Sequence, residues 1–166
     1  MDKYYYLIAS LPLLKFMEPA SITKDDFLSQ AEKWLSREDF TLLNRAGIDN
    51  FLYKPKDTSF LKRWKEFEYS IRTELAFYRK AKKQDSEYKL EKDLRSIIQE
   101  SSNPLEIEIK LLRIRWDFLD EQEIGHFFDL DFLTAYYLKL QISARLASFD
   151  KEKGKQNLEA YSSVEL

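Results

Sequence analysis

The chain has 166 residues and a formal net charge of −2, with 44% hydrophobic and 34% charged residues. This composition is typical of one globular domain and excludes a disordered or membrane-spanning chain. The chain has no cysteine, one histidine (His126) and three glycines, which excludes thiolate catalysis, cysteine-ligated zinc and glycine-rich phosphate loops. Because disulfides are absent, we expect a cytoplasmic protein.

The first predicted element is the aromatic and apolar run Tyr4–Leu14. Its apolar residues do not alternate, so the run predicts either a central β-strand or a buried helix turn, and periodicity does not decide between them. The run is too short to cross a bilayer, which takes about 20 apolar residues. Because it lacks a basic start and a small-residue cleavage site, we expect a buried first element rather than a signal peptide.

Helix start signals follow in chain order. Thr23 and Ser36 are each followed three residues later by an aspartate, the pattern of an N-cap with an acid in the first turn. The strongest signal is Asn103 followed by Pro104 and then Glu106, which together predict a capped helix with proline at its first position. Apolar residues recur at helical spacing after each signal. The predicted helical stretches are 24–46, 59–82, 88–100, 105–119 and 131–149.

The sequence therefore predicts an all-α fold, a single-domain helical bundle, with a short N-terminal strand as the alternative for Tyr4–Leu14. Breaks are expected near Gln84–Ser86 and at Gly125, and Gly154 is predicted to end the last helix. The domain covers 1–155, and 156–166 are predicted to form a short helix and a frayed tail. The predicted core is Leu7, Leu11, Trp34, Trp64, Leu75, Leu112, Trp116, Tyr137 and Leu140.

Acidic residues are concentrated in 117–131, which holds six Asp or Glu and no Lys or Arg. Calcium and magnesium bind such oxygen ligands, so one alternative is a small metal-dependent enzyme that uses this loop and His126. However, the loop lacks the EF-hand order, and Glu123 with His126 matches a di-iron motif that must occur twice. We favour a solvated loop in which Asp129 or Asp131 caps a helix, and we expect no metal and no cofactor.

Charge is polarised along the chain. Residues 54–92 hold twelve Lys or Arg against seven Asp or Glu, whereas residues 93–166 hold nine against fourteen. The basic, aromatic stretch Lys62–Lys83, which includes Lys65, gives a further alternative, a helical nucleic-acid-binding module. Its aromatic residues fall mostly on the apolar stripe of the predicted helix. We therefore favour a solvated face or a contact with an acidic protein, and we expect no nucleic-acid partner.

Three strings carry a family resemblance: KYYYLIASLPLLKF with EPASI and FLSQAEKWL, then NPLEIEIKLLRIRWDFLD, then FLTAYYLKLQISARLASFDKEKG. They resemble a small uncharacterised bacterial family whose genes accompany those of V/A-type rotary ATPases and which is related to the d-type socket protein of their central stalk. The resemblance implies an all-helical, non-enzymatic structural or coupling component, or an assembly factor, that links the central stalk to the membrane ring. It implies partners among the stalk and ring proteins, and a peripheral place at the membrane without insertion.

A socket of this kind needs arginine and aromatic residues at its rim, since both are favoured at interface hot spots. The candidate partner interface is Arg72, Arg79, Arg113, Arg115 and Tyr136.

Overall fold

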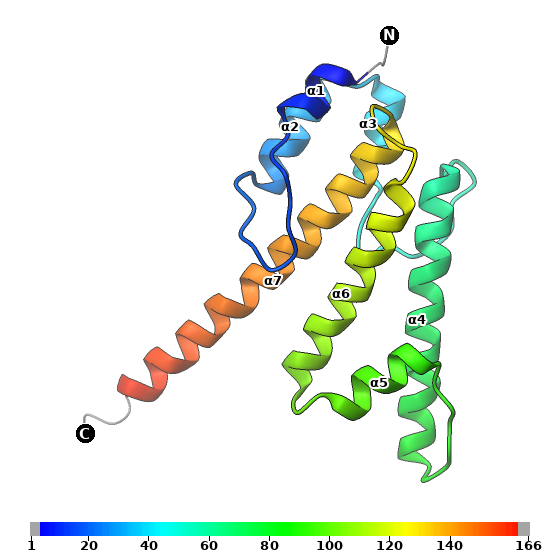
Figure 1. The fold of residues 1–166 in the computed structure, drawn as a ribbon, viewed down its shortest axis with the longest axis vertical. Helices are drawn as coiled ribbons and strands as arrows, with labels where there is room; N and C mark the ends of the chain where they lie inside the picture. Colours follow the sequence, from blue (N-terminus) through cyan, green and yellow to red (C-terminus); the bar gives the residue numbers. More distant parts are fainter. Residues whose placement is uncertain (1–3, 163–166) are drawn as a thin grey trace.

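A computed structural model describes residues 4–162, with side chains described for 4–150 and for Lys155. Over this range the chain forms seven α-helices and no β-strand (Figure 1), which confirms the predicted all-α fold. Part of Tyr4–Leu14 is helical, so the strand alternative is wrong for this segment. The helices are α1 (Tyr5–Ser10), α2 (Lys24–Trp34), α3 (Arg37–Asn44), α4 (Ser59–Lys83), α5 (Lys92–Glu100), α6 (Pro104–Glu123) and α7 (Leu130–Ser162).

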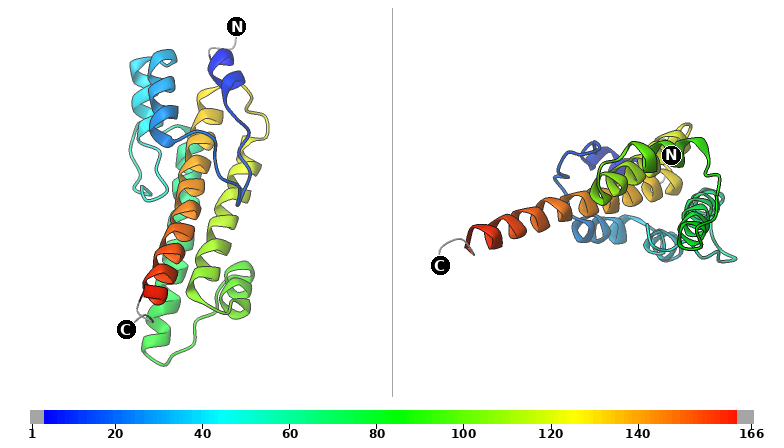
Figure 2. Two further views of the ribbon diagram at one scale, coloured as in Figure 1. Left: turned by 90° about the vertical axis from the view of Figure 1, so that its left-hand side faces the viewer. Right: turned by 90° about the horizontal axis from the view of Figure 1, so that it is seen from below.

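The helix α7 is the central element of the fold. It packs against α2, α3, α4 and α6, and residues 133–140 are all buried. A helix that is apolar around most of its circumference needs neighbours on several sides, which these four helices provide. Figures 1 and 2 show that the C-terminal part of α7 extends away from the other helices.

The predicted helix end at Gly154 is wrong, because α7 continues through this residue to Ser162. A glycine inside a helix weakens it by about 1 kcal/mol relative to alanine but leaves its backbone hydrogen bonds in place. The predicted breaks at Gln84–Ser86 and Gly125 are confirmed, since α4 ends at Lys83 and α6 ends at Glu123.

Two apolar clusters stabilise the bundle. The main cluster joins α1, α2, α3, α6, α7 and the start of α4, with Phe27, Trp64 and Leu133 fully buried in it. A smaller cluster, which includes Leu75 and Leu111, holds α5 against α4 and α6. Near α1–α3 the helices therefore share the main cluster. Toward α5, the smaller cluster holds together only α4, α5 and α6.

The predicted core is confirmed at most positions but not at Trp34. The side chains of seven predicted residues are buried (Leu7, Trp64, Leu75, Leu112, Trp116, Tyr137 and Leu140), and Leu11 is half-buried. Trp34 is 55% exposed, and its ring stacks on that of Tyr6 with 6.1 Å between centroids. The end of α2 is buried through Leu35 instead, so Trp34 lies at the edge of the core.

The predicted helix caps are confirmed. The side chains of Thr23, Ser36 and Asn103 each accept a hydrogen bond from the backbone N–H three residues later. Asp129 caps α7 in the same way, through the N–H of Phe132 at 2.8 Å. Each such cap stabilises a helix by about 1 kcal/mol, because it satisfies a backbone donor that has no partner within the helix.

Glu106 completes the start of α6. Its carboxylate accepts hydrogen bonds of 2.8 Å from the backbone N–H and the hydroxyl of Ser102 and lies 2.9 Å from Lys110 Nζ. The hydrogen bond from Lys110 and those from Ser102 lower the pKa of Glu106 from 4.5 to about 2.

We expect Glu106→Gln to destabilise the protein at neutral pH and to do so less as the pH falls. A carboxyl group with a lowered folded-state pKa stabilises the fold above its unfolded pKa of 4.5, and this contribution is lost as the pH falls toward 2. Urea unfolding of both proteins between about pH 7 and pH 3 measures the difference. A difference in unfolding free energy that is constant over this range would contradict the charged contacts.

Candidate functional site

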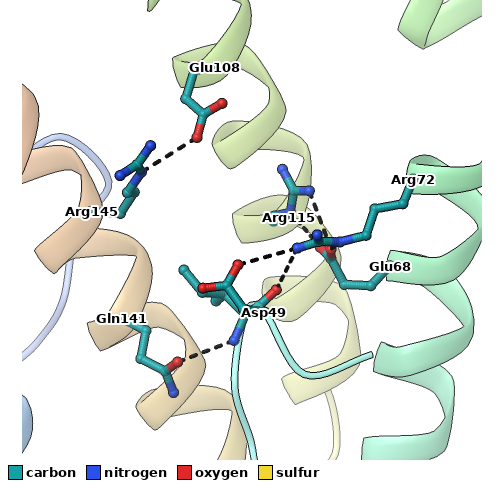
Figure 3. Close-up of polar contacts among 8 residues, drawn as sticks. Asp49, Glu68, Arg72, Glu108, Arg115, Gln141 and Arg145 are labelled. Atoms are coloured by element: carbon teal, nitrogen blue, oxygen red, sulfur yellow. Dashed lines mark hydrogen bonds and ion pairs between the residues drawn. The ribbon is translucent and has the colours of Figure 1, made fainter. Parts of the chain in front are cut away.

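A cleft of about 580 Å³ lies between α4, α6 and α7, and residues 48–51 form one of its walls. Figure 3 shows Arg72 and Gln141 reaching this wall, Arg115 beside Glu68, and Arg145 paired with Glu108 farther along the cleft. We call this feature the arginine cleft. Its lining residues are Ile48, Asp49, Phe51, Arg72, Leu75, Arg79, Glu108, Leu111, Leu112, Arg115 and Arg145.

Helical spacing explains why these side chains share one cavity. On α4, Glu68, Arg72, Leu75 and Arg79 follow one another at intervals of four, three and four residues, which places them along one face of the helix. The lining residues of α6 between Glu108 and Arg115 follow the same rule, as do Gln141 and Arg145 on α7. The cleft is thus formed where three such faces meet.

Glu68 is fully buried and is bound to Arg72 and Arg115, two of the arginines that line the cleft. Its carboxylate accepts hydrogen bonds from Arg72 Nε at 3.0 Å and from Arg115 Nη2 at 3.2 Å, and a further one from Arg115 Nε. A buried carboxylate needs such partners, since an unpaired buried charge is strongly destabilising. One negative charge therefore fixes the positions of two guanidinium groups.

The wall at residues 48–51 is held by side chains from α4 and α7. Arg72 Nη2 donates to the carbonyl oxygen of Ile48 at 3.0 Å and lies 3.4 Å from Asp49 Oδ1. From α7, Gln141 Oε1 accepts a hydrogen bond from the N–H of Ile48 at 3.1 Å, and Gln141 Nε2 donates to the carbonyl oxygen of Ala46 at 3.0 Å. The segment between α3 and α4, residues 45–58, is called the connector. These contacts hold its first part in the site.

Two further arginines line the cleft with fewer contacts. Arg145 Nε lies 3.5 Å from Glu108 Oε1, and both side chains are nearly half exposed. The guanidinium of Arg145 also lies over the Phe149 ring, 4.9 Å from its centroid. Arg79 is exposed and makes no hydrogen bond or ion pair with the residues that the structure describes.

The candidate interface residues fall into three places. Arg72, Arg79 and Arg115 meet in the arginine cleft. Arg113 lies outside the cleft, where it pairs with Asp117 at 2.9 Å. Tyr136 is buried and donates to the carbonyl oxygen of Pro12 at 2.8 Å, so its assignment to an exposed rim is wrong.

Burial also raises the pKa of the Tyr136 hydroxyl to about 12.

Neither Glu68 nor Arg145 was predicted from the sequence to be a site residue. Glu68 lies four residues before Arg72, and Arg145 lies four residues after Gln141, which places each pair on one face of its helix. This spacing was the available signal, but it does not indicate which helix lies opposite.

Several acids of the stretch 117–131 have partners within the chain. Lys139 Nζ lies 2.6 Å from Asp120 and 2.7 Å from Glu123, and His126 Nδ1 lies 2.6 Å from Asp129. Burial is the main cause that raises the pKa of Glu123. Among the described residues, no group of three or more His, Asp or Glu side chains is placed to hold a metal ion.

The basic stretch of α4 is also different from its predicted form. Lys65 is buried rather than on a solvated face, and its Nζ lies 2.7 Å from the equally buried Asp57 Oδ2. Asp57 Oδ2 also accepts a hydrogen bond of 2.8 Å from the N–H of Lys54. This pair fixes the end of the connector on α4.

A family model described as a protein of unknown function (DUF2764) matches residues 82–160. The match includes α5, α6 and most of α7, and therefore Glu108, Arg115 and Arg145, whereas Arg72 and Arg79 precede it. No curated protein and no solved structure matches the chain. In the described part of the chain, no helix has both the length and the apolar character needed to cross a bilayer.

Proposed function

We propose that the protein is a non-enzymatic structural or coupling component, or an assembly factor, of a V/A-type ATPase, similar to the d-type socket protein of the central stalk. We further propose that the arginine cleft is its docking surface. The resemblance of the N-terminal, α6 and α7 strings to the ATPase-associated family supports the first part. The arrangement around buried Glu68 supports the second, because it fixes two arginines in a cleft that two further arginines line.

The chemistry of the cleft favours binding over catalysis. Arginine stays protonated at all ordinary pH values, so these side chains supply fixed positive charge and hydrogen-bond donors rather than a proton that can be transferred. Their planar guanidinium groups are suited to carboxylates. Leu75, Leu111 and Leu112 add apolar surface to the same cavity, and arginine combined with apolar surface is typical of protein interfaces.

The proposed partners are the proteins of the central stalk and the membrane ring, which would place this chain peripherally on the cytoplasmic side of the membrane. The metal-dependent enzyme is less favoured, since Lys139 occupies the carboxylates of Asp120 and Glu123. The nucleic-acid alternative is less favoured because Lys65 is buried in an internal ion pair.

Affinity purification of the tagged protein from its native cells tests this proposal. We expect ATPase components to be recovered with the wild type and to be reduced several-fold with the Arg79→Ala/Arg145→Ala variant. Arg37→Ala is the matched control, since Arg37 is an exposed arginine of α3 outside the cleft. If no ATPase component is recovered and deletion of the gene leaves ATP-driven pumping intact, the proposal is wrong.

A further inference from the structure

We infer that the arginine cleft binds an acidic segment of a partner protein, with Arg79 and Arg145 contacting its carboxylates and with Glu108 as the internal carboxylate that the ligand displaces from Arg145. This inference rests on the proposed docking role of the cleft. It adds the chemical class of the ligand and separates the arginines that contact it from those that are held internally.

The four arginines differ in how many of their donors are used. Arg72 and Arg115 are bound by Glu68, and Arg72 also binds the connector. A guanidinium has five N–H donors, yet Arg145 has a single ion pair, with Glu108 at 3.5 Å, and the side chain of Arg79 has no hydrogen bond or ion pair with the described residues. Most of the donors that remain for a ligand are therefore those of Arg79 and Arg145.

The carboxylates of the cleft indicate which ligand it accepts. Asp49 lies 3.4 Å from Arg72 Nη2 and its side chain is 92% exposed, while Glu108 lies 3.5 Å from Arg145 and is 42% exposed. Exposed ion pairs at these distances contribute little to stability, because water screens them. Glu108 can therefore move aside and leave its position beside Arg145 to a carboxylate of a partner, while Asp49 remains a neighbouring negative charge.

The remaining walls favour a peptide over a phosphate. Phe51, Leu75 and Leu111 give the cleft apolar surface, which can bury apolar side chains between the acidic ones of a peptide. A phosphate group has no apolar part that could use this surface, whereas a peptide has apolar side chains beside its acidic ones.

Fluorescence anisotropy with the purified full chain tests the inference. The probe is a fluorescein-labelled peptide of sequence Glu-Glu-Leu-Glu-Leu-Glu-Glu-Leu, and the same peptide with every Glu replaced by Gln is the control. We expect the acidic peptide to bind, the control peptide not to bind, and the affinity to fall as salt is added. Arg79→Ala/Arg145→Ala should reduce the affinity by about tenfold or more, whereas Arg37→Ala should leave it unchanged.

The exposed carboxylates of the cleft give a test in the opposite direction. We expect Asp49→Asn/Glu108→Gln to increase the affinity several-fold, because the competitor for Arg145 and a neighbouring negative charge are both removed while the arginines remain. A purely structural role for these residues would not strengthen binding. Thermal unfolding checks that each variant is folded, which we expect because all five altered side chains are at least partly exposed.

Three results would overturn the inference: no binding of the acidic peptide to the wild type, equal binding to the Arg79→Ala/Arg145→Ala variant, or tripolyphosphate binding more tightly than the peptide through the same two arginines. The measurement uses the isolated protein. Peptide binding in this assay, together with a purification that recovers no ATPase component, would reject the proposed ATPase role and support the acidic-segment site.

Discussion

Replacing Trp64 with alanine is expected to lower the free energy of unfolding by about 3–5 kcal/mol. The Trp64 side chain is fully buried, and its ring lies 6.0 Å from that of Phe67 and 6.1 Å from that of Phe118 between centroids. Truncation removes this apolar contact and leaves a cavity in the main cluster. Urea unfolding followed by the circular dichroism of the helices gives the free energy directly.

Trp34→Ala is the matched control for this prediction. Trp34 is 55% exposed and its ring contact is with Tyr6, on the surface. Loss of a surface aromatic pair costs about 1 kcal/mol or less. Equal losses for the two variants would contradict the packing described for α2 and α4.

Lys65→Met is expected to lower the free energy of unfolding by about 3–5 kcal/mol, because it leaves the carboxylate of Asp57 buried without its cation. The side chains of Lys65 and Asp57 are 2% and 0% exposed. Within the described part of the chain, Asp57 Oδ1 has no hydrogen-bond partner, so the carboxylate depends on the contacts of its other oxygen. The same unfolding experiment measures the effect.

Two further variants separate charge from packing. Asp57→Asn/Lys65→Met should lose less stability than Lys65→Met alone, since asparagine is neutral and retains an acceptor for the N–H of Lys54. Lys80→Met, at an exposed position of the same helix, should change stability by no more than about 0.5 kcal/mol. If the double variant is as unstable as Lys65→Met, an unpaired charge is not the cause.

The helices of this protein could be predicted from sequence because their signals are local. The caps at Thr23, Ser36 and Asn103 involve residues three positions apart, and apolar spacing within one helix defines its buried face. Trp34 shows the limit of this reasoning. It follows the helical spacing of α2, yet Leu35 fills the core at that end of the helix.

The site was only partly predictable because its contacts join remote parts of the chain. Arg72 and Arg115 were identified by residue type, but the buried Glu68 that binds both lies 47 positions from Arg115. Tyr136 was assigned to a rim although it bonds to Pro12, 124 positions away. Spacing within a helix indicates that such residues share a face, but it contains no information on which element covers that face.

The arrangement of α7 has a mechanical consequence. At about 1.5 Å per residue, its 33 residues span about 50 Å, with the first part packed against four helices and the far end extending away from them (Figure 1). A force applied across the far end would therefore bend α7 where it leaves the helices that pack against it. Leu146 is buried and Phe149 packs against the main cluster, so Arg145 lies in the last packed turns of α7, where bending would act on its ion pair with Glu108.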